Sequence, residues 1–264
     1  MLNRLAVFLL LRHSGVGRYS EVDTLRGLAI GLMICYHAAY DLTLFNLYRT
    51  SVVTGAWRVF GRIPAIMFLG LAGISIWLSY ARLGYSSKGW ESYQYYLIRG
   101  LKLLGWGAII TLASWAYAGQ PVILFGILHL LGSATMLAFP FVRLPARYLI
   151  PGALACIGLG WLLNALPVAY DWLLWLGLRS PNLFQFDYFP LLPWFGLVLA
   201  GVAAGRWLYP CGQRRPELAP LAQWPGVQAL AWLGQRSLLI YLLHQPLLLG
   251  ALSLVSYAAH MPIR

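Results

Sequence analysis

The sequence predicts an all-α fold, a polytopic bundle of about seven transmembrane helices that forms a single domain over residues 1–264. Three observations lead to this fold class. The chain is 60% hydrophobic and only 10% charged, whereas a soluble domain carries roughly 25% charged residues. Its apolar residues gather in segments of about 20, the length that crosses a hydrocarbon core. Its Lys and Arg residues fall unequally on the two sides of those segments, as the positive-inside rule describes.

Seven apolar segments are long enough to span a membrane, and Gly, Pro and charged residues separate them. In chain order they are 24–45, 64–81, 99–117, 122–142, 148–166, 190–209 and 237–257. Three further apolar stretches are too short to span. We expect 5–11 to be an interfacial segment rather than a signal peptide, 170–176 to be re-entrant or interfacial, and 227–233 to be a short interfacial helix.

The Lys and Arg count gives the orientation of the bundle. Fourteen of the 19 basic residues lie on the side that holds the N-terminus, and five lie on the other side. The more basic side is cytoplasmic, so the N-terminus is predicted inside and, with seven spans, the C-terminus outside. The net charge of +12 follows from this anchoring. It does not indicate nucleic-acid binding, because no basic stripe with interleaved aromatics is present.

The first span carries ionisable residues on one helical face. His37 and Asp41 are four residues apart and therefore lie on the same face of the helix. Arg26 lies eleven residues before His37, and the two side chains point in directions that differ by about 20° around the helix axis. His37 is therefore about 16 Å further along the helix than Arg26. A carboxylate one turn from an imidazole suits a general base. The alternative interpretation is a His–Asp pair that ties helices together.

Two more histidines fall within predicted spans. His129 is expected about 12 Å from the outer surface if its span begins near residue 122, and it is a candidate for contact with substrate or for a helix–helix hydrogen bond. His244 is a candidate substrate contact, although packing is the simpler interpretation. A haem is not expected, because only His37 and His129 match in depth. No metal site is expected either, since the chain has no helical His-x-x-x-His and no Cys/His cluster.

Three sets of charged residues flank the spans and are candidates for binding. Arg99 and Lys102 lie a turn apart at the cytoplasmic start of the third span, where they suit phosphates or simple membrane anchoring. Arg58 and Arg62 lie on the outer side against the charge rule, and suit an acidic acceptor or a lipid headgroup. Asp187 lies in an aromatic, proline-rich loop, 186–196, that is either an interface belt or an acceptor platform.

At these residues the chain resembles the bacterial branch of the heparan-α-glucosaminide N-acetyltransferase-like family of transmembrane acyltransferases. The resemblance covers roughly residues 19 to 250. The matching segments are EVDTLRGLA at 21–29, YHAAYDL at 36–42, FLGLAGIS at 68–75, FGILHLLG at 125–132 and DYFPLLPWFG at 187–196. In addition, Arg26 and His37 are similar to an Arg–ten residues–His pattern of the wider superfamily. The segment SLLIYLLHQP at 237–246 looks like that superfamily's last-helix signature.

The resemblance implies an enzyme that moves an acyl group, usually acetyl, from cytoplasmic acetyl-CoA to a sugar hydroxyl or amine reached from the outside. It implies a bacterial inner-membrane location and leaves a homodimer open. The chain is shorter than the lysosomal members, has fewer helices, has His37 where those enzymes carry an amide residue, and lacks their His-containing loop after the first span. A different acceptor is therefore expected, and N- and O-acylation both stay open.

The residues and the resemblance together suggest one mechanism. Arg26, Arg99 and Lys102 hold the CoA phosphates, and His37 deprotonates the acceptor or takes the acyl group itself. Asp41 orients His37, and His129 stabilises the oxyanion or positions the acceptor. The competing class is a proton-coupled transporter or flippase that uses His37 and Asp41 as a proton relay, and a third class is a structural membrane protein. A cytoplasmic basic cluster favours the acyltransferase, because a proton relay does not need one.

Overall fold

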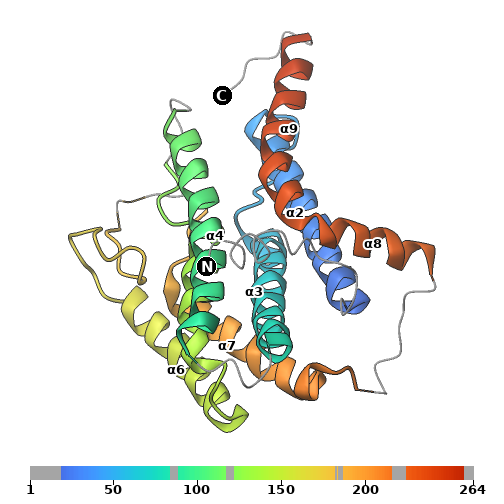
Figure 1. The fold of residues 1–264 in the computed structure, drawn as a ribbon. Coiled ribbons are helices and arrows are strands. Elements are labelled where there is room, and N and C mark those ends of the chain that lie inside the picture. The colour runs from blue at the N-terminus through green and yellow to red at the C-terminus, as the bar shows by residue number, and fades with distance from the viewer. Residues whose placement is uncertain are drawn as a thin grey trace, which may run out of the picture. The chain divides into compact units, whose positions relative to one another are not determined.

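A computed structural model describes residues 19–83, 89–116, 122–181, 183, 187–215 and 224–258, and within these ranges the chain is helical with no strand. The predicted segment 5–11 lies outside the described residues. Figure 1 shows the helices in colour order from blue to red. Their bounds are α2 Ser20–Leu44, α3 Gly55–Leu83, α4 Trp90–Ala116, α5 Ile127–Phe141, α6 Ala146–Asn164, α7 Leu191–Leu208, the 3₁₀ turn η1 Pro210–Gly212, α8 Pro225–Gln235 and α9 Ser237–Ala258.

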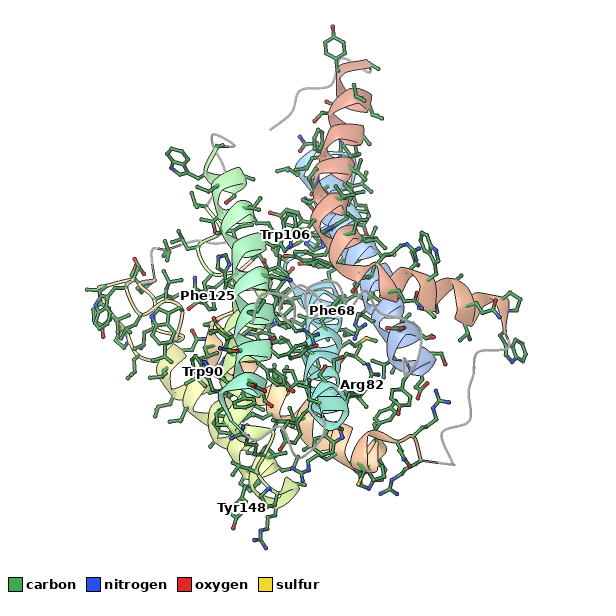
Figure 2. The ribbon with its side chains drawn as sticks, viewed as in Figure 1. Phe68, Arg82, Trp90, Trp106, Phe125 and Tyr148 are labelled. Carbon is green, nitrogen blue, oxygen red and sulfur yellow. The ribbon has the colours of Figure 1, made fainter. Side chains whose placement is uncertain are left out.

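The helices confirm the predicted fold class. Six of the described helices (α2, α3, α4, α6, α7 and α9) are long and apolar enough to cross a membrane. Large apolar side chains stand on their outer surfaces: Leu112 is 64% exposed, Trp161 74% and Leu254 71%. Tyr148 projects outward at the start of α6 (Figure 2). Apolar surface of this kind is stable against lipid rather than water, so the chain is an integral membrane protein.

The helix in the fourth predicted span is shorter than expected. The span was predicted over 122–142, but α5 has only 15 residues, about 22 Å of helix. Residues 122–126 are not helical, and α4 pairs with the backbone of one of them, Ile123. Thr111 Oγ1 donates to the Ile123 carbonyl over 2.6 Å, and the Ile123 N–H donates to Ser114 Oγ over 3.0 Å. Two hydroxyls on α4 therefore satisfy both backbone groups of Ile123 outside a helix.

The chain divides into two compact units, residues 1–57 with 219–264 and residues 58–218, and each is described by itself. In the first unit, α2 and α8 touch backbone to backbone. A Cβ added to Gly27 would overlap the Leu230 carbonyl, and one added to Gly234 would overlap the Asp23 carbonyl. The short helix predicted at 227–233 is present as α8. Its contact with α2 depends on these two glycines.

The second unit contains α3 from Arg58 onward and α4 to α7. Glycines again allow close approach, since a Cβ on Gly73 would overlap the Val198 carbonyl and one on Gly201 the Gly70 carbonyl. The buried indole of Trp77 on α3 donates to the Tyr209 carbonyl over 2.9 Å. The stretch predicted as re-entrant or interfacial, 170–176, forms turns rather than a helix.

Candidate active site

His37 lies on α2, and its hydrogen bond determines which ring nitrogen carries the proton. His37 Nδ1 is 2.9 Å from the carbonyl oxygen of Met33, one turn earlier. A carbonyl only accepts hydrogen bonds, so Nδ1 carries the hydrogen of the neutral ring and Nε2 presents a lone pair. A general base or a nucleophile acts through such a lone pair. The local helix therefore sets His37 in the form that the proposed chemistry needs.

Asp41 is fully buried one turn further along α2. Its carboxylate accepts two hydrogen bonds from Gln245 Nε2 of α9, at 2.9 and 3.1 Å. We expected Asp41 to orient His37 directly, but the contacts differ, because the Met33 carbonyl holds the imidazole and Gln245 holds the carboxylate. The role of Gln245 was missed, although a polar amide inside an apolar span was a visible signal.

His244 of α9 lies against His37. The two imidazole centroids are 4.9 Å apart and their planes meet at 73°, so the rings are in edge-to-face contact. His244 Nδ1 is 2.6 Å from the Tyr241 carbonyl oxygen. The sequence suggested His244 only as a substrate contact or as packing, whereas the structure makes it a direct neighbour of the candidate base.

Arg26 lies at the other end of α2 and already has an acidic partner. Its Nη1 is 2.9 Å from Asp23 Oδ1, and the Asp23 side chain is only 6% exposed. The predicted stripe from Arg26 to His37 thus begins at an ion pair rather than at an isolated cation.

In the second unit, His129 lies in the first turn of α5. The Gly126 N–H donates to His129 Nδ1 over 3.3 Å, so Nδ1 is unprotonated and Nε2 carries the hydrogen of the neutral ring. Its ring packs on Gly107 of α4, where an added Cβ would lie 2.9 Å from Cε1. His129 therefore offers a donor where His37 offers an acceptor. The depth predicted for it assumed a helix from residue 122, whereas α5 begins at Ile127.

Asp187 caps the same helix. Its Oδ2 accepts a hydrogen bond from the Ile127 N–H over 3.2 Å, and a carboxylate at this end also interacts favourably with the helix dipole. The structure thus brings two separately predicted site residues, His129 and Asp187, to one helix end. Sequence patterns did not reveal the cap, because it comes from a residue 60 positions later.

The loop that follows Asp187 is tied to its own unit. The Phe189 N–H donates to the Phe125 carbonyl over 3.1 Å. The Tyr188 hydroxyl donates to the Leu174 carbonyl over 2.7 Å, and burial raises the pKa of Tyr188 to about 12. The phenol therefore stays neutral and remains a donor at physiological pH.

The other predicted binding residues differ in exposure. Arg99 of α4 is half-buried and donates to Ser79 Oγ of α3 over 3.3 Å, while Lys102, one turn on, is exposed. Arg58 and Arg62 are both exposed on the first turns of α3.

Among the described residues, no cluster of three or more His, Cys, Asp or Glu suits a metal ion.

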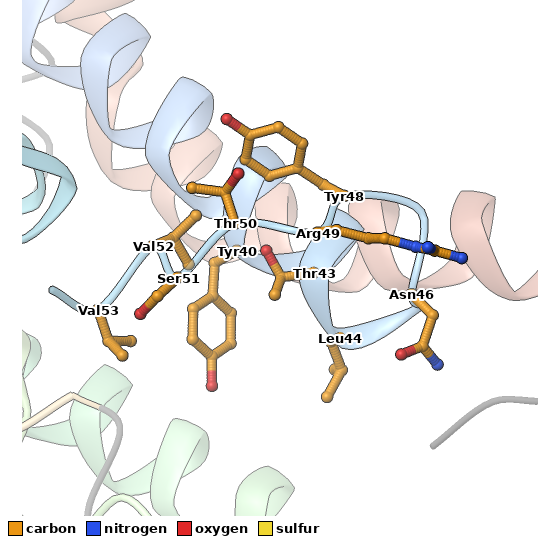
Figure 3. A pocket seen from close by; sticks show the side chains of 10 residues that line it. All are labelled: Tyr40, Thr43, Leu44, Asn46, Tyr48, Arg49, Thr50, Ser51, Val52 and Val53. Atoms are coloured by element: carbon orange, nitrogen blue, oxygen red, sulfur yellow. The ribbon is translucent and has the colours of Figure 1, made fainter.

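An open hollow of about 940 Å³ lies at the end of α2. Figure 3 shows Tyr40 and Thr43 on the last turns of the helix and Arg49 on the loop that follows. Its polar lining residues are Tyr40, Thr43, Asn46, Tyr48, Arg49, Thr50 and Ser51. The sequence did not indicate this hollow, which begins at the neighbour of Asp41.

The apolar helices define the class of an integral membrane protein, and the half-buried imidazole of His37, with a lone pair at Nε2, is suited to acid–base chemistry. The family described as heparan-alpha-glucosaminide N-acetyltransferase, catalytic, matches residues 18–246. The chain belongs to this family, as the sequence resemblance indicated. Neither the curated proteins nor the solved structures contain a significant match. Membership makes the chain a membrane acetyltransferase, and the family uses acetyl-CoA as its acetyl donor.

Proposed function

We propose that this protein transfers an acetyl group from cytoplasmic acetyl-CoA to a hydroxyl or amine of a saccharide or similar acceptor at the outer side of a bacterial inner membrane. The observation that carries the proposal is the state of His37. Its Nδ1 is engaged with Met33 and its Nε2 has a lone pair, on a helix whose opposite end carries Arg26. One span thus holds a candidate base and, about 16 Å away, a cation for the donor.

The basic residues support a cytoplasmic donor. CoA carries phosphates, and guanidinium and ammonium groups bind phosphate by charge-assisted hydrogen bonds. The proposal assigns this binding to Arg26 and, on α4, to Arg99 and Lys102. Arg58, Arg62 and Asp187 are assigned to the acceptor. Each assignment is testable by a single substitution, with acetyl-CoA affinity as the readout for the first group and acceptor KM for the second.

His37 performs the proton transfer in this proposal. The acceptor oxygen or nitrogen forms a bond to the thioester carbonyl carbon, and His37 Nε2 takes the proton from that oxygen or nitrogen. The carbon–sulfur bond of the thioester then breaks. The CoA thiolate takes the proton back, so that charge and atoms balance. His129 Nε2–H is the type of donor that stabilises a developing oxyanion, which is the role proposed for it. The chain's own hydrogen bonds set both tautomers in advance.

The test uses purified protein in lipid nanodiscs with labelled acetyl-CoA. We expect the wild type to bind acetyl-CoA and to release or transfer the acetyl group, and His37→Ala to bind it without transfer. Cys35→Ala is the matched control, since Cys35 is exposed on the same helix. The proposal fails if the wild type neither binds nor consumes acetyl-CoA. Proton uptake without acetyl consumption would instead support the transporter alternative.

A further inference from the structure

The second imidazole nitrogen of His244 has no obvious purpose in the fold. The side chain is 9% exposed, and its Nδ1 hydrogen faces the Tyr241 carbonyl over 2.6 Å. Nε2 of the neutral ring therefore presents a lone pair. Among the described residues this atom is buried and has no hydrogen-bond partner. A buried acceptor without a donor is unfavourable, which suggests that a donor reaches this nitrogen during function.

His37 becomes a donor at one step of the proposed reaction. While His37 is neutral, its Nε2 presents a lone pair, as Nε2 of His244 does. Two lone pairs cannot form a hydrogen bond with each other. When His37 takes the acceptor's proton, its Nε2 gains an N–H. The His244 ring lies in edge-to-face contact, with its centroid 4.9 Å away. An imidazolium beside a neutral imidazole with a spare lone pair is stabilised by that lone pair.

We propose that His244 is a positioning residue that holds His37 and stabilises its protonated form during acetyl transfer, so that the two imidazoles share one proton. The inference rests on the proposed function of His37. No group beyond the reactants is needed: the acceptor's O–H or N–H bond breaks, the proton goes to His37 Nε2, and His244 Nε2 accepts a hydrogen bond from it. The proton leaves with the CoA thiol.

The neighbours of the pair are consistent with one shared proton. On α2, the titratable groups are Tyr36, whose ring is 5.7 Å from that of His37, and buried Asp41. On α9, the ring of Tyr241 is 5.6 Å from that of His244. When ionised, the Asp41 carboxylate, which Gln245 holds, can balance one positive charge. Two protonated imidazoles would leave one of these charges unbalanced in an apolar bundle.

The experiment measures acetyl transfer against pH for wild type, His244→Asn and His244→Leu. Leu has no acceptor, so we expect kcat/KM to fall about ten- to a hundredfold at neutral pH. The acid limb of the profile should move to lower pH, because protonated His37 loses a stabilising neighbour. Asn keeps an amide acceptor, so it should recover part of the rate and lie between the two. Leu247→Ala is the control, since Leu247 is exposed on α9 and its variant should match the wild type.

The outcomes separate this inference from the function on which it rests. The inference is supported if the acid limb moves to lower pH in both variants and moves less for His244→Asn than for His244→Leu. Either variant alone shows in which direction the limb moves. A limb that stays in place, with or without a loss of rate, assigns His244 to packing and overturns the inference. If the wild type itself transfers no acetyl group, the proposed function has failed independently of His244. Acetyl-CoA binding by each variant shows that the protein is folded.

Discussion

At the residue scale, two histidines take opposite roles because their backbones differ. His37 is inside a helix, where the carbonyl four residues earlier accepts from Nδ1. His129 is in a first turn, where a free backbone N–H donates to Nδ1. The same side chain thus becomes an acceptor at Nε2 in one helix and a donor in the other. This difference supports the proposed roles of His37 as base and of His129 as donor.

Tyr188 gives a prediction about pH at the same scale. Its pKa is raised to about 12 because the phenol is buried. The folded state then holds the phenolic proton more tightly than the unfolded state, and this contribution is present below pH 10 and lost as pH rises from 10 to 12. An ultraviolet titration of wild type minus Tyr188→Phe should show one phenol ionising near pH 12. A difference step near pH 10 would show that Tyr188 is not buried in this way.

Asp187 links the residue scale to the element scale, because it caps α5. Asp187→Ala removes the acceptor of the Ile127 N–H, and we expect a loss of about 0.5–2 kcal/mol in the free energy of unfolding. Thermal unfolding in detergent should show a lower Tm for this variant, with Asp187→Asn in between, since an amide oxygen still accepts. Equal Tm values for all three proteins would remove Asp187 from the cap.

At the element scale, glycines determine how closely helices approach. Gly27 and Gly31 are one turn apart on α2, but only Gly27 faces the α8 backbone, and a Cβ on Gly31 meets nothing within 4 Å. Gly27→Ala should lower the free energy of unfolding by about 1–3 kcal/mol, because the Leu230 carbonyl has to move. Gly31→Ala is the matched control and should leave stability equal or higher by roughly 0.5–1 kcal/mol. Chemical unfolding of both variants measures this, and equal effects would contradict the packing.

The positions of the helices were predictable, and their partners were not. Apolar length and charged ends locate the spans, because lipid imposes both. The face shared by His37 and Asp41 follows from helical periodicity. Gln245 contacts Asp41 across 204 residues of sequence, and no local pattern gives that pairing. The start of α5 was misplaced for a similar reason, since the two hydroxyls on α4 that pair with the backbone of Ile123 lie 9 and 12 residues earlier in the chain.

At the scale of the whole molecule, topology decides which chemistry faces which compartment. Six described helices are long enough to span, and α5 is shorter. With α5 as the seventh span, we expect the N-terminus inside and the C-terminus outside. A C-terminal fusion to alkaline phosphatase, which is active only outside the cytoplasm, should therefore be active, and a fusion to a fluorescent protein that matures only inside should be dark. The reverse pattern would mean an even number of spans.

We propose that acetyl transfer in this member of the family depends on His37. The most direct measurement is the single-turnover rate of acetyl transfer from saturating labelled acetyl-CoA, for wild type and His37→Ala in the same nanodiscs. A general base typically contributes about 10²–10⁴-fold, so we predict that the rate falls by that factor in His37→Ala while the acetyl-CoA affinity is unchanged. A His37→Ala protein that transfers acetyl at the wild-type rate would contradict it.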